Sequence, residues 1–263
     1  MKIKKRLLSL ALSGVMVLGL MPGMNMTALA ADNVSTYTLQ IPSTLNVSAA
    51  GWNETSGLTA AVSSGDTFDS GKKLSVTASS ANNWSLKSGD NSVGYNLTTA
   101  TGSYSNSATP ASWEFTAAEL NANGGTNKAM GIVVEDYSKK PAGTYQDTVT
   151  FTAKVVTIRT VTWNNDDITG SGNSFTKDGV TITAGSIDFD EKNFEEDGTF
   201  TTALGKFTKI EVVATNGFCD VSGTGWSGDS DKRTWTGNAS SVKFIGDIYG
   251  DGNGIKFVFT IER

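Results

Sequence analysis

The stretch PAGTYQDTVTFTAKV, residues 141–155, alternates apolar and polar residues after a Pro-Ala-Gly turn. Val149, Phe151 and the apolar residues at the next alternate positions share one side, while Thr150 and Thr152 share the other. Side chains of a β-strand point to opposite faces with a period of two, so the pattern predicts a half-buried strand. We expect Phe151 to face a core and the threonines to form a polar outer row.

The same period of two recurs along the chain and predicts many short strands. It appears in residues 37–41, 73–78, 93–97, 132–134, 180–184, 210–214, 242–244 and 255–261. With 29 Gly and only 4 Pro, the connections are predicted to be glycine and asparagine turns. One exception is TAAE, residues 116–119, where Thr116 and Glu119 fit the capping box of a single helical turn. Short strands at regular spacing indicate an all-β sandwich or barrel.

The N-terminal residues have the three parts of a secretory signal peptide. Four basic residues within positions 2–6 precede an apolar run at 7–21, and an A-x-A pattern ends the segment. This order predicts a signal peptide over residues 1–30, cut between Ala30 and Ala31. A membrane anchor is disfavoured because serines and glycines interrupt the apolar run, and a lipoprotein is excluded because no Cys lies near the cut. We therefore expect a secreted, extracellular protein.

The charge and cysteine content of the chain restrict the kinds of molecule that it can bind and the ways in which it can be stabilised. The chain carries 26 Asp and Glu against 21 Lys and Arg, and four of the basic residues lie in the expected signal peptide. An acidic chain without a basic stripe repels phosphate backbones, so no nucleic-acid partner is expected. No transmembrane segment is expected after cleavage, because the stretch GIKFVFTIER at 254–263 alternates. Cys219 is the only cysteine, so stability must come from core burial and not from disulfides within the chain.

A change in composition near residues 156–159 predicts two domains. The first, residues 31–156, is rich in Ala, Ser and Thr, whereas the second, residues 157–263, carries acidic clusters such as DFDEKNFEEDG at 188–198. The strand within 141–155 closes the first domain, and no flexible linker follows it. We predict an all-β protein of two consecutive Ig-like β-sandwich domains behind the cleaved signal peptide.

Two motifs of the first domain resemble the WxL-type β domains of exported surface proteins of Gram-positive bacteria. They are NWSLKSG at residues 83–89, which contains a Trp-Ser-Leu triplet, and AGTYQDTVTFTAKV at 142–155, where Phe151 stands in place of the usual Trp. The second domain resembles, more loosely, a module of unknown function from large exported proteins of anaerobic Gram-positive bacteria. The stretches that carry this resemblance are ITGSGNSFTKDGVTITAGSIDF at 168–189 and GTGWSGDSDKRTWTGNASSVKFIGD at 223–247. Together they imply a secreted, multi-domain, WxL-like protein of the cell surface.

The sequence offers few of the residues on which enzyme catalysis usually depends. The chain has no His, which removes His-based triads and His-ligated zinc. Cys219 has no basic neighbour in sequence to activate it, and beside Phe218 and Val221 it is interpreted as a small buried side chain. A glycosidase needs only paired carboxylates, but the acidic residues cluster in stretches that we expect to be solvated loops. We therefore predict that the protein is not an enzyme.

Calcium is the one cofactor that the carboxylates suggest. Asp188 with Asp190, and Asp247 with Asp251, offer oxygen ligands of the kind that calcium prefers. None fits the EF-hand loop, because Lys192 takes the fifth position when counting starts at Asp188. Loop carboxylates are more often plain surface charge, and no other cofactor is expected.

Tryptophans divide into two groups. Trp84, Trp113 and Trp163 have apolar neighbours and are predicted to lie in strands of the core. Trp52 and Trp226 lie between glycines and polar residues, so each is a candidate surface for stacking on a sugar ring. The alternative for each is a ring folded back over the end of a sandwich.

Two functions agree with these features. The first is a non-enzymatic structural or adhesive protein of the bacterial envelope, held at the cell wall through cell-wall polymer, glycan or other surface proteins. The alternative is a secreted carbohydrate-binding module that uses Trp52 and Trp226. The final residues contain no LPxTG-type sorting signal, so we expect adhesion without covalent attachment, or release.

Overall fold

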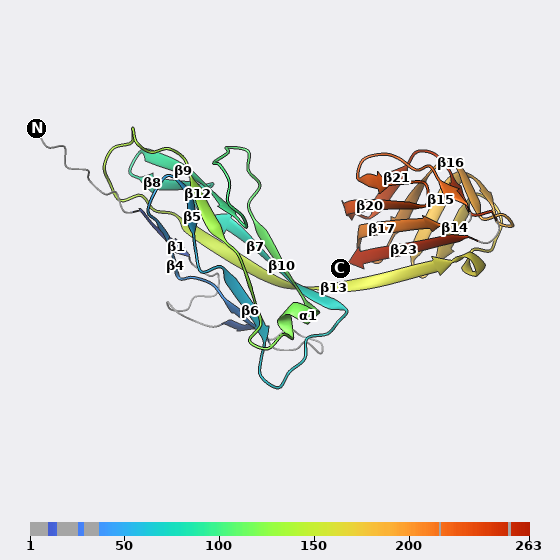
Figure 1. Ribbon diagram of the computed structural model, residues 1–263, viewed down its shortest axis with the longest axis horizontal. Helices are drawn as coiled ribbons and strands as arrows, with labels where there is room; N and C mark the ends of the chain where they lie inside the picture. The colour runs from blue at the N-terminus through green and yellow to red at the C-terminus, as the bar shows by residue number, and fades with distance from the viewer. Residues whose placement is uncertain (1–9, 15–25, 29–36, 216, 252–253) are drawn as a thin grey trace, which may run out of the picture. The chain divides into compact units, whose positions relative to one another are not determined.

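The computed structural model describes residues 10–14, 26–28, 37–215, 217–251 and 254–263. The chain divides between Val155 and Val156 into two compact units, called unit 1 and unit 2 (Figure 1). Both consist of strands, and the described residues contain only one short α-helix and one 3-10 turn, η1 (Asn165–Asp167). The predicted all-β sandwich fold is confirmed.

Unit 1 contains three groups of paired strands. The first comprises β10 (Ser112–Thr116), β7 (Lys72–Ser80), the first half of β13 (Thr148–Asn164), β1 (Leu10–Gly14) and β4 (Thr44–Val47). The second comprises β11 (Thr126–Lys128), β6 (Leu58–Val62), β3 (Tyr37–Gln40) and β2 (Met26–Ala28). The third comprises β5 (Gly51–Glu54), β12 (Gly131–Val134), β9 (Asn91–Thr98) and β8 (Ser85–Ser88).

Unit 2 contains two sheets. The first comprises the second half of β13, β23 (Ile255–Glu262), β17 (Lys206–Ala214), β20 (Lys232–Ala239) and β19 (Trp226–Gly228). The second comprises β14 (Ser174–Lys177), β15 (Val180–Asp188), β16 (Asn193–Thr202), β22 (Ile248–Tyr249) and β18 (Phe218–Cys219), with β21 (Ser241–Phe244) also paired to β16. Every strand predicted from the period of two is present.

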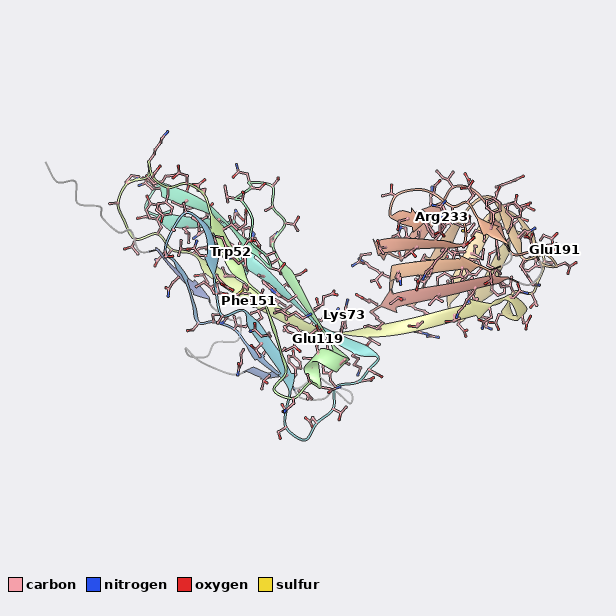
Figure 2. The ribbon with its side chains drawn as sticks, viewed as in Figure 1. Trp52, Lys73, Glu119, Phe151, Glu191 and Arg233 are labelled. Carbon is pink, nitrogen blue, oxygen red and sulfur yellow. The ribbon has the colours of Figure 1, made fainter. Side chains whose placement is uncertain are left out.

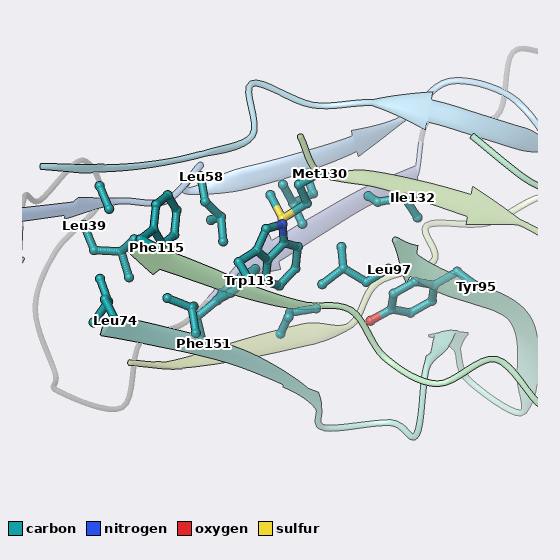
Figure 3. Packing of buried hydrophobic residues seen from close by; sticks show 14 of the residues in the cluster. Leu39, Leu58, Leu74, Tyr95, Leu97, Trp113, Phe115, Met130, Ile132 and Phe151 are labelled. Atoms are coloured by element: carbon teal, nitrogen blue, oxygen red, sulfur yellow. The ribbon is translucent and has the colours of Figure 1, made fainter. Parts of the chain in front are cut away.

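Strand β13 shows the predicted alternation. Val149 and Phe151 are buried, Thr152 is exposed and Thr150 is half-buried. The Phe151 ring packs in the core of unit 1, where its centroid lies 5.9 Å from that of Trp113 (Figure 3). The sequence pattern therefore assigned the two faces of this strand correctly.

The predicted helical turn is also confirmed, as α1 (Ala117–Leu120). The Glu119 backbone N–H donates to Thr116 Oγ1 at 3.3 Å, and the Thr116 backbone N–H donates to the Glu119 carboxylate at 2.8 Å. This reciprocal pair satisfies two backbone donors that the helix end leaves open. Glu119 also forms an ion pair with Lys128 at 2.8 Å, and both the pair and the Thr116 hydrogen bond hold the pKa of Glu119 below its ordinary value.

Unit 1 buries a carboxylate among its apolar residues. Asp147 is 3% exposed and accepts hydrogen bonds from the Ser80 hydroxyl, from the Tyr95 hydroxyl at 2.7 Å and from the Asn82 backbone N–H at 3.1 Å. Burial, and then the contact with Asp147, raises the pKa of Tyr95, so its hydroxyl stays a donor. The network joins the start of β13 to the turn after β7.

Trp84 requires a correction. It occupies the bend before β8 and not a strand, with a φ of 58°, and it is half-buried. Its backbone N–H donates to Ser80 Oγ at 2.6 Å, and Ser80 is itself held by Asp147. Such a side-chain to backbone bond competes with the pairing of a strand. The indole still packs edge-on against Tyr95, with centroids 5.6 Å apart.

Unit 2 has a core of linked aromatic rings. Trp163 is fully buried and lies 4.9 Å from Phe175 and 4.6 Å from Phe259 between ring centroids. Phe200, also fully buried, lies 5.2 Å from Phe244 and 5.5 Å from Phe259. Edge-to-face and tilted pairs of this kind contribute beyond the area that they bury. The predicted core positions of Trp113 and Trp163 are both confirmed.

Two short strands lie inside the expected signal peptide. β1 pairs antiparallel with β4 and parallel with β13, and β2 pairs antiparallel with β3. Ala30 and Ala31 lie outside the described residues, so cleavage between them stays a prediction. No helix among the described residues is long and apolar enough to span a membrane.

Candidate binding surface

The exposed large hydrophobic residues of the described chain are Phe218 and Ile245, which are 43% and 60% exposed. Both belong to one ribbon of unit 2, formed by residues 218–222 and 245–249. Phe218 pairs with Tyr249, and the backbones of Ser222 and Ile245 exchange two hydrogen bonds at 2.9 and 3.1 Å. The ribbon therefore presents apolar surface to solvent at both of its ends.

Strand alternation sorts the residues of this ribbon into two faces. The inner face is buried and comprises Cys219, Val221 and Ile248. The outer face, which we call the acidic-aromatic face, comprises Phe218, Asp220, Ser222, Ile245, Asp247 and Tyr249. Because successive side chains of a strand point to opposite sides, the buried inner residues require these six to point outward.

The aromatic pair at one end of this face is stacked. The ring centroids of Phe218 and Tyr249 lie 5.2 Å apart and their planes differ by 9°. The Tyr249 hydroxyl lies 3.4 Å from an Asp247 carboxylate oxygen. Desolvation, followed by the charges of Asp247 and Glu195, raises the pKa of Tyr249, so the phenol remains a hydrogen-bond donor at neutral pH. The carboxylates of Asp247 and Glu195 thus lie near the Tyr249 hydroxyl, at the polar end of the stacked ring pair.

Beside Ile245, a groove of about 870 Å³ continues the surface. Its lining includes hydroxyl groups, charged groups and one indole, among them those of Thr183, Glu196, Asp197, Thr224, Trp235 and Lys243. The mixture of hydroxyl, carboxylate and ammonium groups gives the groove both donors and acceptors. These groups can bond to the hydroxyl groups of a ligand, while the apolar part of the lining can contact its carbon atoms.

A β-bulge in strand β16 shapes the groove. The pairing of β15 with β16 shifts at Gly185, and Glu196 and Asp197 opposite it have φ values of 62° and 60°. Asp197 Oδ1 accepts the Gly246 N–H at 2.8 Å, and Asp247 Oδ1 accepts the Glu196 N–H at 2.9 Å. The expectation of a loop is wrong for residues 195–197, because they belong to strand β16. Glu196 and Asp197 are nevertheless exposed to solvent, as expected, because the bulge leaves them outside the pairing with β15.

The residues predicted to hold calcium lie in two separate places. Asp188 and Asp190 are at the β15–β16 turn, where Asp188 Oδ1 accepts the backbone N–H groups of Asp190 at 2.9 Å and Glu191 at 3.0 Å. Asp247 supports the bulge, and Asp251 follows β22. Within the described part of the chain, no three acidic or Cys residues are grouped so that they could hold a metal ion. Calcium binding stays a prediction.

The two candidate stacking tryptophans lie in strands. Trp52 belongs to β5 (Figure 2), and its ring covers Gly131 so closely that a side-chain carbon there would lie 2.0 Å from it. Trp226 begins β19, and its Nε1 donates to the Lys243 carbonyl at 2.9 Å. Its ring lies 6.3 Å from that of Phe200. Both indoles are half-buried and lie against the protein on one side.

Cys219 is fully buried under the acidic-aromatic face. Burial raises the pKa of its thiol to about 11, an effect larger than that of the nearby Arg233 guanidinium, which acts in the opposite direction. A thiol with this pKa is almost entirely protonated at neutral pH and is a poor nucleophile.

The sequence reasoning missed Phe218 and Tyr249 as surface residues. A signal was present, because a strand that buries Cys219 and Val221 must expose Phe218 and Asp220. The partner of Phe218 could not be read from that pattern, since Tyr249 lies in a different strand. No family model matches the chain and no curated protein is significantly similar to it, so the surface is interpreted from its geometry.

Proposed function

We propose that this is a non-enzymatic, secreted structural or adhesive protein of the bacterial envelope, which contacts cell-wall glycan through the acidic-aromatic face of unit 2. The observation that best supports this function is the stacked and exposed pair of Phe218 and Tyr249. Phe218, exposed at 43%, and Tyr249 together present a flat apolar surface to solvent. A ligand that covers the two rings removes this apolar area from water.

Sugar rings match the chemistry of this face. The C–H side of a pyranose packs on a flat aromatic surface, while its hydroxyl groups need acceptors at the rim. Asp220 and Asp247 supply carboxylates beside the rings, and the groove next to Ile245 supplies further hydroxyl and carboxylate groups. A neutral or amino sugar polymer therefore fits this surface better than an anionic one.

The non-enzymatic part of the proposal rests on the available side chains. The sequence contains no His, and the only thiol is buried with a raised pKa. The envelope location rests on the signal-peptide pattern and on the resemblance of the first domain to WxL-type domains. Fractionation of producing cells into wall, membrane and medium tests that location directly.

Binding is tested by sedimentation of the protein with insoluble peptidoglycan and with an insoluble neutral polysaccharide. Phe218→Ala should weaken binding roughly tenfold, which corresponds to about 1.4 kcal/mol. Phe189→Ala is the matched control, because it removes a half-buried ring from the β15–β16 turn of the same unit. Its binding should equal that of the unaltered protein.

The alternative module is tested in the same assay. If Trp52→Ala or Trp226→Ala abolishes binding while Phe218→Ala does not, the tryptophans carry the site and the acidic-aromatic face does not. If the protein binds neither polymer in any form, the glycan-binding part of the proposal is wrong. Recovery of the unaltered protein from the wall fraction would then favour a protein partner at the envelope.

A further inference from the structure

Three carboxylates of unit 2 lie in one row across strands β18, β22 and β16. Ile248 on β22 pairs with Phe194 on β16 and, on its other edge, with the β18 residue that precedes Asp220. In antiparallel strands the next residues are then also opposite one another, which places Asp220, Asp247 and Glu195 side by side. The Asp220 backbone N–H donates to the Asp247 carbonyl at 2.9 Å, in agreement with this register. We call these three residues the carboxylate row.

The carboxylate row carries more negative than positive charge. The Asp220 side chain is 69% exposed, and its one ion pair among the described residues is a long one, 3.9 Å from the Arg233 guanidinium. Asp247 and Glu195 form no ion pair with a Lys or Arg of the described chain. Like charges that face one another on paired strands repel. A cation bound at this row would reduce the repulsion.

The stacked rings of Phe218 and Tyr249 form the neighbouring row on the same side of β18 and β22. Two positions along a strand separate the two rows, a distance of about 7 Å. The Tyr249 hydroxyl lies where the rows meet, 3.4 Å from an Asp247 carboxylate oxygen, and the charge of Glu195 also acts on it. A ligand that covers the rings therefore brings its neighbouring substituent to the carboxylates.

We propose that the acidic-aromatic face binds glycans whose amino groups are free and protonated, with the ammonium at the carboxylate row and the sugar ring on Phe218 and Tyr249. This inference rests on the proposed glycan-binding function and specifies the sugar. A primary ammonium has three N–H donors, which match the carboxylate oxygens around it, and its charge strengthens each hydrogen bond. An acetylated amino group is uncharged and has one donor, so it leaves the carboxylate row without a cation.

The test compares two soluble β-1,4-linked oligomers of equal length, one of glucosamine and one of N-acetylglucosamine. Calorimetric titrations of the full protein at mildly acidic pH measure both affinities. The glucosamine oligomer should bind at least roughly tenfold more tightly in low salt, and added salt should weaken that oligomer more than the acetylated one, because salt screens exposed charges.

Asp220→Asn tests the carboxylate row directly, because this exposed side chain takes no part in supporting the bulge. It should weaken binding of the glucosamine oligomer roughly tenfold without changing the thermal midpoint of unfolding. Asp190→Asn is the matched control, since it removes the same charge from an exposed residue of the β15–β16 turn. The control should keep the preference for the glucosamine oligomer.

Four outcomes would overturn the inference. If the two oligomers bind equally and Phe218→Ala weakens both, the proposed glycan-binding function stands and the preference for free amino groups is wrong. If neither oligomer binds, the inference is wrong whatever the insoluble polymers show. If Asp190→Asn weakens binding as much as Asp220→Asn, the overall charge of the protein causes the preference. If a lysine oligomer binds as tightly as the glucosamine oligomer and Phe218→Ala weakens neither, the face recognises ammonium groups and not a sugar.

Discussion

Unit 1 and unit 2 are both β-sandwiches, but they stabilise their interiors differently. The buried polar side chains of the described chain are Asn53, Lys73, Asn96 and Asp147, and all four lie in unit 1. The described part of unit 2 buries no comparable polar side chain, and its core is a connected set of Trp and Phe rings. The same fold class is therefore stabilised in two ways, by buried polar side chains in unit 1 and by packed aromatic rings in unit 2.

The two units also support their left-handed residues with different hydrogen-bond partners. In unit 1 the left-handed residues Asn83 and Trp84 lie next to the Asp147 network, whose side-chain oxygens accept hydrogen bonds from the backbone N–H groups of the turn. In unit 2 the left-handed Glu196 and Asp197 lie at the surface, and Asp247 holds the bulge from outside. The bulge of unit 2 therefore lies beside the candidate binding face, and binding residues are commonly found at such surface segments.

The largest expected effect tests the aromatic core of unit 2. Phe200→Ala should lower the free energy of unfolding of unit 2 by about 3 to 5 kcal/mol, near the upper end of that range, because several rings lose a neighbour at once. Hydrogen exchange of the β16 and β23 amides measures this loss. Phe189→Ala, which removes a half-buried ring, should cost clearly less. Equal losses would contradict the idea of a connected aromatic core.

The corresponding change in unit 1 is Phe151→Ala. Its ring is buried and packs on Trp113, so we expect a loss of about 3 to 5 kcal/mol, toward the lower end because fewer rings meet there. Thr150→Ala, one position away on the opposite face, should cost less than about 1 kcal/mol. Thermal unfolding of the two variants compares them, and similar midpoints would show that the two faces of β13 are wrongly assigned.

The buried carboxylate of unit 1 has no counterpart among the described residues of unit 2. Both oxygens of Asp147 accept hydrogen bonds, so Asp147→Asn must turn an amide donor toward other donors such as Tyr95. We expect a loss of about 2 to 3 kcal/mol in the unfolding free energy of unit 1. Asp90→Asn, at an exposed carboxylate in the β8–β9 turn, is the control and should be neutral in denaturant titrations. If Asp147→Asn left the free energy of unfolding of unit 1 unchanged, the proposed distinction between the two units would be wrong.

The smallest expected change in stability concerns Glu211 and its two lysine partners on the surface of unit 2. Hydrogen bonds from Lys232, and then from Lys209, hold the pKa of Glu211 below its ordinary value of 4.5. Since the folded state lowers this pKa, the contribution is present at neutral pH and is lost as the pH falls through the folded-state pKa. It should stay well under about 1 kcal/mol, because the lysines are solvent-exposed.

Glu211→Gln should therefore unfold more easily than the unaltered protein at pH 7 in low salt, and the difference should vanish in strong acid. Denaturant titrations at several pH values measure it. Glu191→Gln, at an exposed turn residue, is the control (Figure 2). A difference that grew as the pH fell would have the wrong sign for a lowered pKa.

The sequence by itself determined the features that depend on near neighbours along the chain. The period of two assigned Phe151 to the core and Thr152 to solvent, because a strand must alternate its side chains. The Thr116 and Glu119 pair predicted α1, because a capping box closes within one helical turn. The same reasoning identified Trp113 and Trp163 as core residues.

Only the tertiary structure decided which distant segments meet. The Asp147 carboxylate accepts a hydrogen bond from the Ser80 hydroxyl, 67 positions earlier in the sequence. Ser80 in turn accepts the backbone N–H of Trp84, which therefore lies in a bend and not in the predicted strand. Phe218 meets Tyr249 because β18 and β22 pair, and strand pairing depends on the packing of the whole sheet and not on local composition. Alternation could assign each residue to a face, but it could not say which other strand shares that face.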